Sequence, residues 1–429
     1  MARALAALLV LLLADSASPQ AQPPAKPPLG PAAGPSDAPE GWKLEPFSIS
    51  NQAAGFQVEL TGYVQADFRK FQDWQVGDGL DPTLRAADHE WRRLRIGFQG
   101  EWRKLVFEFD VDPAFDEGDE LKDARLGLRL AKPLEIHGGH MKLPVSPEWL
   151  TSAAKTDFIE RAALVTSLGP GRDWGGLLQG ELGRALEWRA GVFESDARTS
   201  PRRAGTTAAA RLVVKPSEWF DLGGSFSQGD VLADRESPGF DPFPKGLEGT
   251  SATGYEFFHG VYVNGQRRRW GVDARVQRGP VSLWGEFLEA REERKGQGPV
   301  LEDLPDVYGR GWSATATWLV TRERKTRTIQ PSRRLFTGPG AVELSARYEE
   351  LWFDDVSNAG FESSGSRAGN VRPAGIRTFT GGLSWWPTGF LRLMGNVLIE
   401  RYDDALRAPE PGNAGDYVSL LGRIQVQLP

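Results

Sequence analysis

The sequence predicts an all-β protein, a transmembrane antiparallel β-barrel of about sixteen strands. Three observations support this prediction. Apolar and polar residues alternate along most of the chain after residue 55, the polar faces carry arginine and carboxylate in rough balance, and short turns alternate with long polar connections. This combination is typical of barrels in which one face of each strand meets lipid and the other meets a water-filled lumen.

The N-terminus predicts export. Arg3 precedes an apolar stretch from Leu5 to Ala14, followed by small and polar residues. This arrangement is typical of a secretory signal peptide, which we assign to residues 1–21. A buried core helix is the alternative, but the next segment offers it nothing to pack against. Residues 22–43 are rich in Pro and Ala and predict a flexible linker, so the barrel domain is expected to span 44–429.

Alternation is clear from the first expected strand onward, where Val58 and Leu60 alternate with Glu59 and Thr61. Strict period-two alternation predicts a strand with one apolar face. The same pattern recurs around residues 94–102, 105–112, 125–130, 186–192, 269–277, 342–347 and 418–426. Roughly 385 residues follow the linker, and at ~10 residues per strand with alternating connections they form about sixteen strands.

The connections between these strands are of two kinds. Short turns are expected at 103–104, 132–133, 278–280 and 387–389, and long polar stretches at 74–89, 227–250, 295–307, 326–340, 356–377 and 403–415. Outer-membrane barrels place short turns in the periplasm and long loops outside the cell. Tryptophans near strand ends are candidates for interfacial girdles, although ordinary packing is equally possible for each one: Trp91, Trp102, Trp219, Trp312, Trp352, Trp385 and Trp386.

Other protein classes fit the sequence less well. A soluble secreted β-sandwich would also alternate, but its polar faces prefer Lys, Ser and Thr to paired arginine and carboxylate. After the first residues no apolar run approaches the ~20 residues of a membrane-spanning helix. The absence of cysteine excludes disulfides and thiol chemistry. The net charge of −6 does not favour nucleic acid as a partner.

Several consecutive segments resemble the phosphate-selective porin O/P family. They are Glu90–Gly100, Leu121–Gly127, Leu134–Pro144, Ser146–Ser152, Asp157–Arg161 and Arg172–Gly176, in the order of the family's blocks. The resemblance implies a sixteen-stranded porin of the outer membrane of a Gram-negative bacterium, usually a homotrimer surrounded by outer-membrane lipid, with one long loop folded into the pore. That loop would correspond to Val145–Ala163.

Candidate pore residues are cationic side chains on polar strand faces and in the expected pore loop: Arg69, Arg93, Arg95, Arg125, Arg129, Lys155 and Arg161. Guanidinium groups suit forked contacts to phosphate and other small inorganic or organic anions. The same strands place Glu59, Asp67, Glu108, Asp110 and Asp123 nearby. Two interpretations stay open: the arginines form an anion ladder, or they pair with these carboxylates and stiffen the wall of a weakly selective pore.

Signs of catalysis or metal binding are weak. His137 and His140 lie three residues apart on an expected strand, where they face opposite sides and are poorly placed to share a metal. No phosphate-cradling glycine motif and no nucleophile motif stands out. We therefore expect no enzyme and no cofactor. The sequence favours a passive porin for small hydrophilic solutes, with a closed barrel that serves as a structural or surface-binding protein as the alternative.

Overall fold

The structure, a computed structural model, describes residues 43–45, 47–71, 87–114, 120–198, 204–232, 245–298, 302–326, 328–355, 371–410, 412–413 and 415–428. The expected signal peptide and, apart from Lys43, the expected linker lie outside the described residues.

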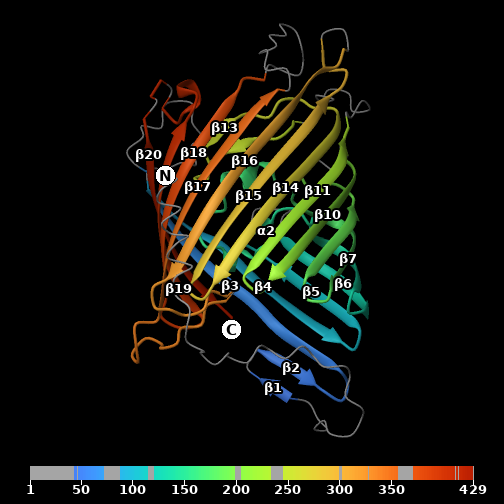
Figure 1. Cartoon of the computed structure of the whole chain (residues 1–429), viewed down its shortest axis with the longest axis vertical. Coiled ribbons are helices and arrows are strands. Elements are labelled where there is room, and N and C mark those ends of the chain that lie inside the picture. Colours follow the sequence, from blue (N-terminus) through green and yellow to red (C-terminus); the bar gives the residue numbers. More distant parts are fainter. Residues whose placement is uncertain are drawn as a thin grey trace.

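Sixteen antiparallel strands close into a barrel, as predicted (Figure 1). They are β3 (Phe56–Phe71), β4 (Ala87–Trp102), β5 (Leu105–Val111), β6 (Leu121–Ala131), β7 (Leu134–Lys142), β8 (Arg172–Leu182), β9 (Leu186–Phe193), β10 (Ala204–Ser217), β11 (Phe220–Val231), β14 (Gly265–Arg278), β15 (Val281–Arg294), β16 (Leu304–Leu319), β17 (Ala341–Asp355), β18 (Ala374–Trp386), β19 (Leu391–Tyr402) and β20 (Tyr417–Gln427). Each strand pairs with its neighbours in sequence, and β20 pairs with β3 to close the ring. Among the described residues, no helix is long and apolar enough to cross a membrane.

A small hairpin precedes the barrel. β1 (Lys43–Glu45) pairs with β2 (Ser48–Asn51), and β2 pairs with the first residues of β3 from Phe56 to Glu59. The pairing of β20 with β3 begins only at Tyr63. The hairpin therefore continues the sheet along the part of β3 that extends beyond β20, and it covers an edge that would otherwise present unpaired backbone groups.

The alternation of the sequence sets the two faces of the wall. Leu344 and Leu383 are exposed on the outer face of the barrel, whereas Arg347 and Thr380 on the same strands are buried inside it. Side chains of a strand point alternately to the two faces of the sheet. An apolar outer surface facing lipid and a polar interior follow directly from the period-two pattern.

Most of the tryptophans named above lie on the outer face, as an interfacial girdle requires. Trp91, Trp102 and Trp219 are each at least half exposed, with Trp91 at 72%. Trp386 contradicts this expectation, because it is buried with Leu319 and Ile329 inside the barrel. Trp385, the preceding residue, takes the outward position on β18.

The two ends of the barrel differ in their connections (Figure 1). The short turns expected at 103–104, 132–133, 278–280 and 387–389 are observed at 103–104, 132–133, 279–280 and 387–390, and all lie at one end, called the short-turn end below. The stretch 326–340 was expected among the long loops of the opposite end, and this expectation is wrong. It belongs to the connection between β16 and β17, and the Lys325 backbone N–H donates to the carbonyl of Gly279 in a short turn. Sequence length alone did not reveal on which end this connection lies.

Two connections from the long-loop end fold against lumen-facing side chains. Residues 143–171, called the inner loop, contain α2 (Pro147–Leu150), η1 (Ala153–Lys155) and α3 (Ala163–Leu168). The α2 helix starts where the Ser146 hydroxyl accepts the Trp149 N–H at 3.1 Å and Pro147 occupies the first turn. The second segment carries β12 (Gly249–Thr250) and β13 (Glu256–Phe258). Phe258 stacks on Phe353 of β17 with ring centroids 4.4 Å apart, so the apolar core of the molecule lies within the barrel.

Candidate functional site: the barrel lumen

The inner loop packs against one side of the lumen, formed by β15 to β20 and β3, which we call the covered wall. The Asn396 side chain of β19 accepts the Ile159 N–H at 2.8 Å, and the Glu349 carboxylate of β17 accepts the Ala163 N–H at 2.6 Å. The Arg392 guanidinium donates to the Thr156 carbonyl at 2.8 Å. Because these side chains satisfy the backbone of the loop, they define its position in the barrel.

Arginine and carboxylate alternate beneath this loop. The Arg423 guanidinium binds both oxygens of Asp67 at 2.6 and 2.7 Å, which joins β20 to β3. Arg347 of β17 reaches the Glu148 carboxylate at 3.4 Å and donates to the Glu160 carbonyl at 3.2 Å. Arg347 and Arg423 are both almost fully buried. The loop is thus held by charges that the lumen solvent does not reach.

Glu160 is the anionic centre of a second arginine group. Its carboxylate lies 3.0 Å from Arg69 and 3.5 Å from Arg92. Burial opposes ionisation of this side chain, but the neighbouring guanidinium groups, those of Arg92, Arg423 and Arg69 above all, outweigh it and hold the pKa of Glu160 at about 2. Glu160 is therefore a stable counter-ion, and these arginines are not free to meet a solute.

A β-bulge in β4 places Arg92 in this group. The register shifts there, with Gln65 opposite Arg93 but Ala66 opposite Trp91, so Arg92 is the extra residue. Trp91 still points outward, while both Arg92 and Arg93 are drawn inward. A bulge adds one residue without a partner and redirects side chains locally. Simple alternation assigns Arg92 to the lipid face, and for that reason the sequence analysis missed it.

The opposite side of the lumen, from β5 to β11 with β14, meets the inner loop toward the long-loop end, where Arg269 of β14 donates to the Leu168 carbonyl at 2.7 Å. The rest of this side borders open space, and we call it the open wall. Two cavities lie between it and the inner loop. The larger, of about 380 Å³, is bounded by β9, β10, β11, β14 and residues 147–157 of the loop, and also by Trp284 and Arg392 of the covered wall and by the β16–β17 connection. The smaller, of about 160 Å³, is bounded by β4 to β9. Both are lined by Leu150, Ser152 and Arg189, so they adjoin at these residues.

Cations outnumber carboxylates on the described lining of both cavities. Seven cationic and five acidic side chains line the larger cavity. Five cationic and three acidic side chains line the smaller one. Several are paired: Arg211 binds Asp273 through two contacts of 2.7 and 2.9 Å, Arg125 contacts Glu108, and Lys215 contacts Glu187. Arg275 instead lies over the Trp284 ring, 5.8 Å from its centroid. The lining has mixed charge with a basic excess.

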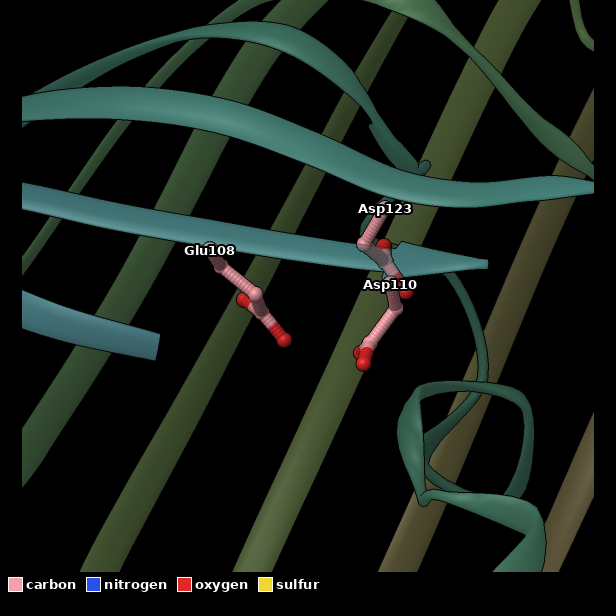
Figure 2. A group of neighbouring side chains, drawn as sticks. All are labelled: Glu108, Asp110 and Asp123. Atoms are coloured by element: carbon pink, nitrogen blue, oxygen red, sulfur yellow. The ribbon is translucent and has the colours of Figure 1, made fainter. Parts of the chain in front are cut away.

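Three carboxylates of the smaller cavity lie close together: Glu108, Asp110 and Asp123, with one oxygen of each within 4.8 Å of the others. Figure 2 shows them projecting from β5 and β6. Cations already balance two of them, because Arg125 contacts Glu108 and Arg172 contacts Asp123 at 3.3 Å. Asp110 accepts the Thr61 hydroxyl at 3.2 Å. The group is part of a charge-alternating lining, as its arginine partners indicate.

The residues expected to form the pore site separate into three groups. Arg95, Arg125 and Lys155 line the cavities. Arg69 and Arg93 lie beneath the inner loop, where the Arg93 guanidinium donates to the Gln65 side chain at 3.0 Å. Arg129 and Arg161 also lie away from the cavity linings. Arg129 contacts Glu101 and Glu135, and Arg161 donates to backbone carbonyls of the inner loop itself.

Several cavity cations escaped the sequence analysis. They are Lys142, Arg172, Arg189, Arg211, Lys215, Arg275, Lys325 and Arg392. Arg189 and Arg275 stand on polar faces of clearly alternating strands, so the period-two signal was sufficient to find them. Both follow the expected pore loop in the sequence, whereas the predicted site residues lie in that loop or on strands before it. The two histidines behave as their spacing suggests: His137 is buried inside, whereas His140 packs on the outward-facing Trp174.

Lys325 joins two segments that enter from opposite ends of the barrel. Its ammonium group contacts Asp157 of the inner loop at 2.7 Å and Glu343 of β17 at 2.6 Å. Asp157 also accepts the Trp284 indole N–H at 3.2 Å. The connection between β16 and β17 therefore reaches into the lumen from the short-turn end and contacts the inner loop at Asp157.

Comparisons with known proteins agree with this architecture. The family model for phosphate-selective porin O and P matches residues 58–428. A search of curated proteins finds no match. Among solved structures, the trimer form of OmpT from Vibrio cholerae has a TM-score of 0.55 at 11% identity, covering 87% of this chain and 100% of that chain. An anion-selective porin from Comamonas acidovorans gives 0.52 at 12%, with coverage of 87% and 100%. Salmonella typhi OmpF in complex with daunomycin gives 0.53 at 11%, with coverage of 87% and 98%. At these identities the likeness concerns the fold.

Proposed function

Because the chain belongs to the family of phosphate-selective porins O and P, we propose that it lets small hydrophilic anions, phosphate among them, diffuse passively across the outer membrane. Outer-membrane porin is the general assignment, and anion preference is the proposal. The observation that carries it is the basic excess on the described lining of both cavities. In a narrow passage with low-dielectric walls such an excess raises the local concentration of anions.

The mixed charge of the lining sets the expected strength of this preference. Conduction requires binding that is favourable enough for entry and weak enough for release. Paired cations such as Arg211 and Lys215 keep a carboxylate beside each guanidinium or ammonium group, which shortens the stay of an anion. We therefore propose a moderate anion preference and no permanent phosphate complex.

The experiment is a reversal-potential measurement in planar bilayers across a salt gradient. We expect an anion-selective sign, and the double substitution Arg189→Ala and Arg275→Ala to lower the anion-to-cation permeability ratio by roughly a factor of a few. Arg377→Ala is the matched control, because Arg377 lies on the outer face and pairs with Asp403. A cation-selective unmodified channel would refute the anion proposal and leave the porin assignment intact.

A closed barrel that binds a partner through its outer loops is the second candidate. The segments that enter the lumen favour this candidate. The inner loop and the β16–β17 connection come from opposite ends and meet at the Lys325–Asp157 contact, where they narrow the passage. Reproducible single-channel conductance steps would exclude this candidate. Their absence from folded protein would support it.

Orientation, export and assembly complete the proposal. We place the short-turn end in the periplasm, residues 1–21 as a cleaved signal peptide, and the mature chain in a homotrimer like the trimer form recorded for OmpT of Vibrio cholerae. The chain has no cysteine, so single-cysteine labelling is unambiguous. On intact cells Lys295→Cys should react with a membrane-impermeant reagent and Lys132→Cys should not. The reverse result would invert the barrel. Chemical cross-linking in detergent tests the trimer.

A further inference from the structure

Five side chains form a continuous row across the middle of the covered wall. They occupy directly opposed positions on five adjacent strands: Glu286 of β15, Ser313 of β16, Glu349 of β17, Thr378 of β18 and Glu400 of β19. All five are at most 4% exposed. We call them the carboxyl row, because carboxyl groups alternate in it with hydroxyl groups.

The row is short of hydrogen-bond partners. Neither oxygen of Glu286 has a partner with good geometry among the described residues, although the Ser146 hydroxyl lies near it. The hydroxyls of Ser313 and Thr378 and one oxygen each of Glu349 and Glu400 share this condition within the described part of the chain. Buried polar groups are normally hydrogen-bonded, so this concentration of exceptions on five neighbouring strands needs an explanation.

The row also carries more negative than positive charge. Glu148 of the inner loop is near enough to Glu286 and to Glu349 to repel both when all three are ionised, and Glu349 repels Glu400. Among the described residues, Arg347 is the cation within ion-pair distance, 3.4 Å from both Glu148 and Glu349. Four buried carboxylates beside one guanidinium group would be strongly unfavourable, because unpaired charges are costly away from water.

Other groups near the row do not remove this imbalance. On the inner loop Arg161 attracts Glu148, and Asp157 repels it. Beyond the loop, Arg211 of β10 and Asp273 of β14 act on Glu286 with opposite signs and bind each other. Glu400 accepts the hydroxyls of Thr253 and Tyr402, which are neutral. Burial raises the pKa of Glu148, in keeping with a site that favours neutral carboxyl groups.

A protonated carboxyl group resolves both difficulties. It has no charge, and it donates one hydrogen bond while its other lone pairs accept. The two hydroxyl groups of the row can each donate only one hydrogen bond to its three carboxyl groups, so each added proton supplies a donor that the row lacks. The row lies directly behind the inner loop, since Glu349 accepts the Ala163 N–H and Glu286 adjoins Ser146.

We propose that Glu286 and Glu349 are positioning residues that hold the inner loop against the covered wall in their protonated form, so that the loop loosens as the pH rises. The consequence for transport rests on the proposed porin function, because a loosened loop changes the passage along the open wall. The contribution of the row to loop docking is present at low pH and is lost as protons leave at high pH.

The test is hydrogen exchange of residues 146–168 in detergent-solubilised protein, which requires no ion flow. From about pH 6 to about pH 9, a range that spans the titration of many buried carboxyl groups, we expect exchange to accelerate about tenfold beyond its intrinsic pH dependence. The variant carrying Glu286→Gln and Glu349→Gln should show no such acceleration, because glutamine keeps a donor and an acceptor without titrating.

Glu350→Gln is the matched control, since Glu350 follows Glu349 on β17 but faces outward, where it accepts the Tyr348 hydroxyl. It should keep the response of the unmodified protein. Unchanged exchange in the unmodified protein, which depends on no variant, would overturn the proposal, as would a full response in the double glutamine variant. Conductance recorded over the same pH range should follow the exchange data. Exchange that responds to pH in a barrel without conductance would support the row and refute the porin proposal.

Discussion

The covered wall and the open wall derive from the same sequence pattern, yet their charged side chains do different things. On the covered wall Arg347 and Arg423 are almost fully buried and bind carboxylates or loop carbonyls. On the open wall Lys215 and its partner Glu187 each remain about a third exposed. The difference is the inner loop, which shields one side from solvent. An inward polar residue is therefore structural or solute-facing according to what packs over it.

The largest expected effect separates two arginines of these walls. Arg347→Ala should lower the free energy of unfolding by ~3–5 kcal/mol, because it removes a buried guanidinium group that contacts Glu148 and donates to the Glu160 carbonyl. Arg189→Ala on the open wall should cost less, about 1 kcal/mol, because Arg189 lines both cavities and does not lie beneath the inner loop. Denaturant unfolding in detergent measures both. Equal costs would mean that the two walls do not differ in the way described.

The next prediction compares the cost of introducing an arginine on the outer face with its cost on the open wall. Valine is replaced in both cases. Val272→Arg places a charge on the lipid-facing side of β14 and should destabilise the folded barrel by ~2–4 kcal/mol. Val213→Arg adds the same charge to the lining of the larger cavity and should be tolerated. Heat-modifiable mobility in gels reports the folded fraction.

A third prediction uses pH. The pKa of Glu160 is about 2, below its ordinary 4.5, so ionised Glu160 contributes stability that is present above about pH 4.5 and is lost as the pH falls toward 2. Glu160→Gln should remove this acid-dependent loss, on the order of 2–3 kcal/mol, and lower stability at neutral pH. Glu187→Gln on the open wall is the control: Glu187 is about a third exposed and lies outside the arginine group around Glu160, so the acid-dependent loss should persist in this variant. The readout is the unfolding midpoint at several pH values.

The smallest expected effect is on selectivity. Lys155→Ala removes an exposed cation of the inner loop that lines the larger cavity. Its charge is solvated and one of seven cations on that lining, so the reversal potential should shift toward cations by less than in the Arg189 and Arg275 double variant. A larger shift in reversal potential for Lys155→Ala would indicate that the inner loop, and not the open wall, determines the selectivity of the passage.

Alternation predicted the fold because every strand repeats the same two-face rule. It placed Arg95 and Arg125 correctly on the lumen face, where both line a cavity. It failed at Arg92, where a bulge interrupts the period. Trp386 lies inward in step with Thr380 and Ser384 of β18, so only the expectation of an interfacial girdle failed there. The inner-loop neighbours of Arg347 and Glu286 could not be predicted from the sequence for another reason. They come from a loop more than a hundred residues away, and no local pattern records such contacts.

The closure of the barrel has a consequence for the order in which the chain folds. β3 and β20 meet through the Gln65–Gln425 hydrogen bond of 2.7 Å and the bidentate contact of Arg423 with Asp67, between residues some 356 to 360 positions apart. All other neighbouring barrel strands are also neighbours in sequence, so they form with far smaller losses of chain entropy. The pairing of β3 with β20 is thus the most non-local step of folding. Once it forms, the buried Arg423–Asp67 ion pair stabilises it. Until it occurs, the β1–β2 hairpin already occupies part of the edge of β3 and limits its pairing with a foreign strand.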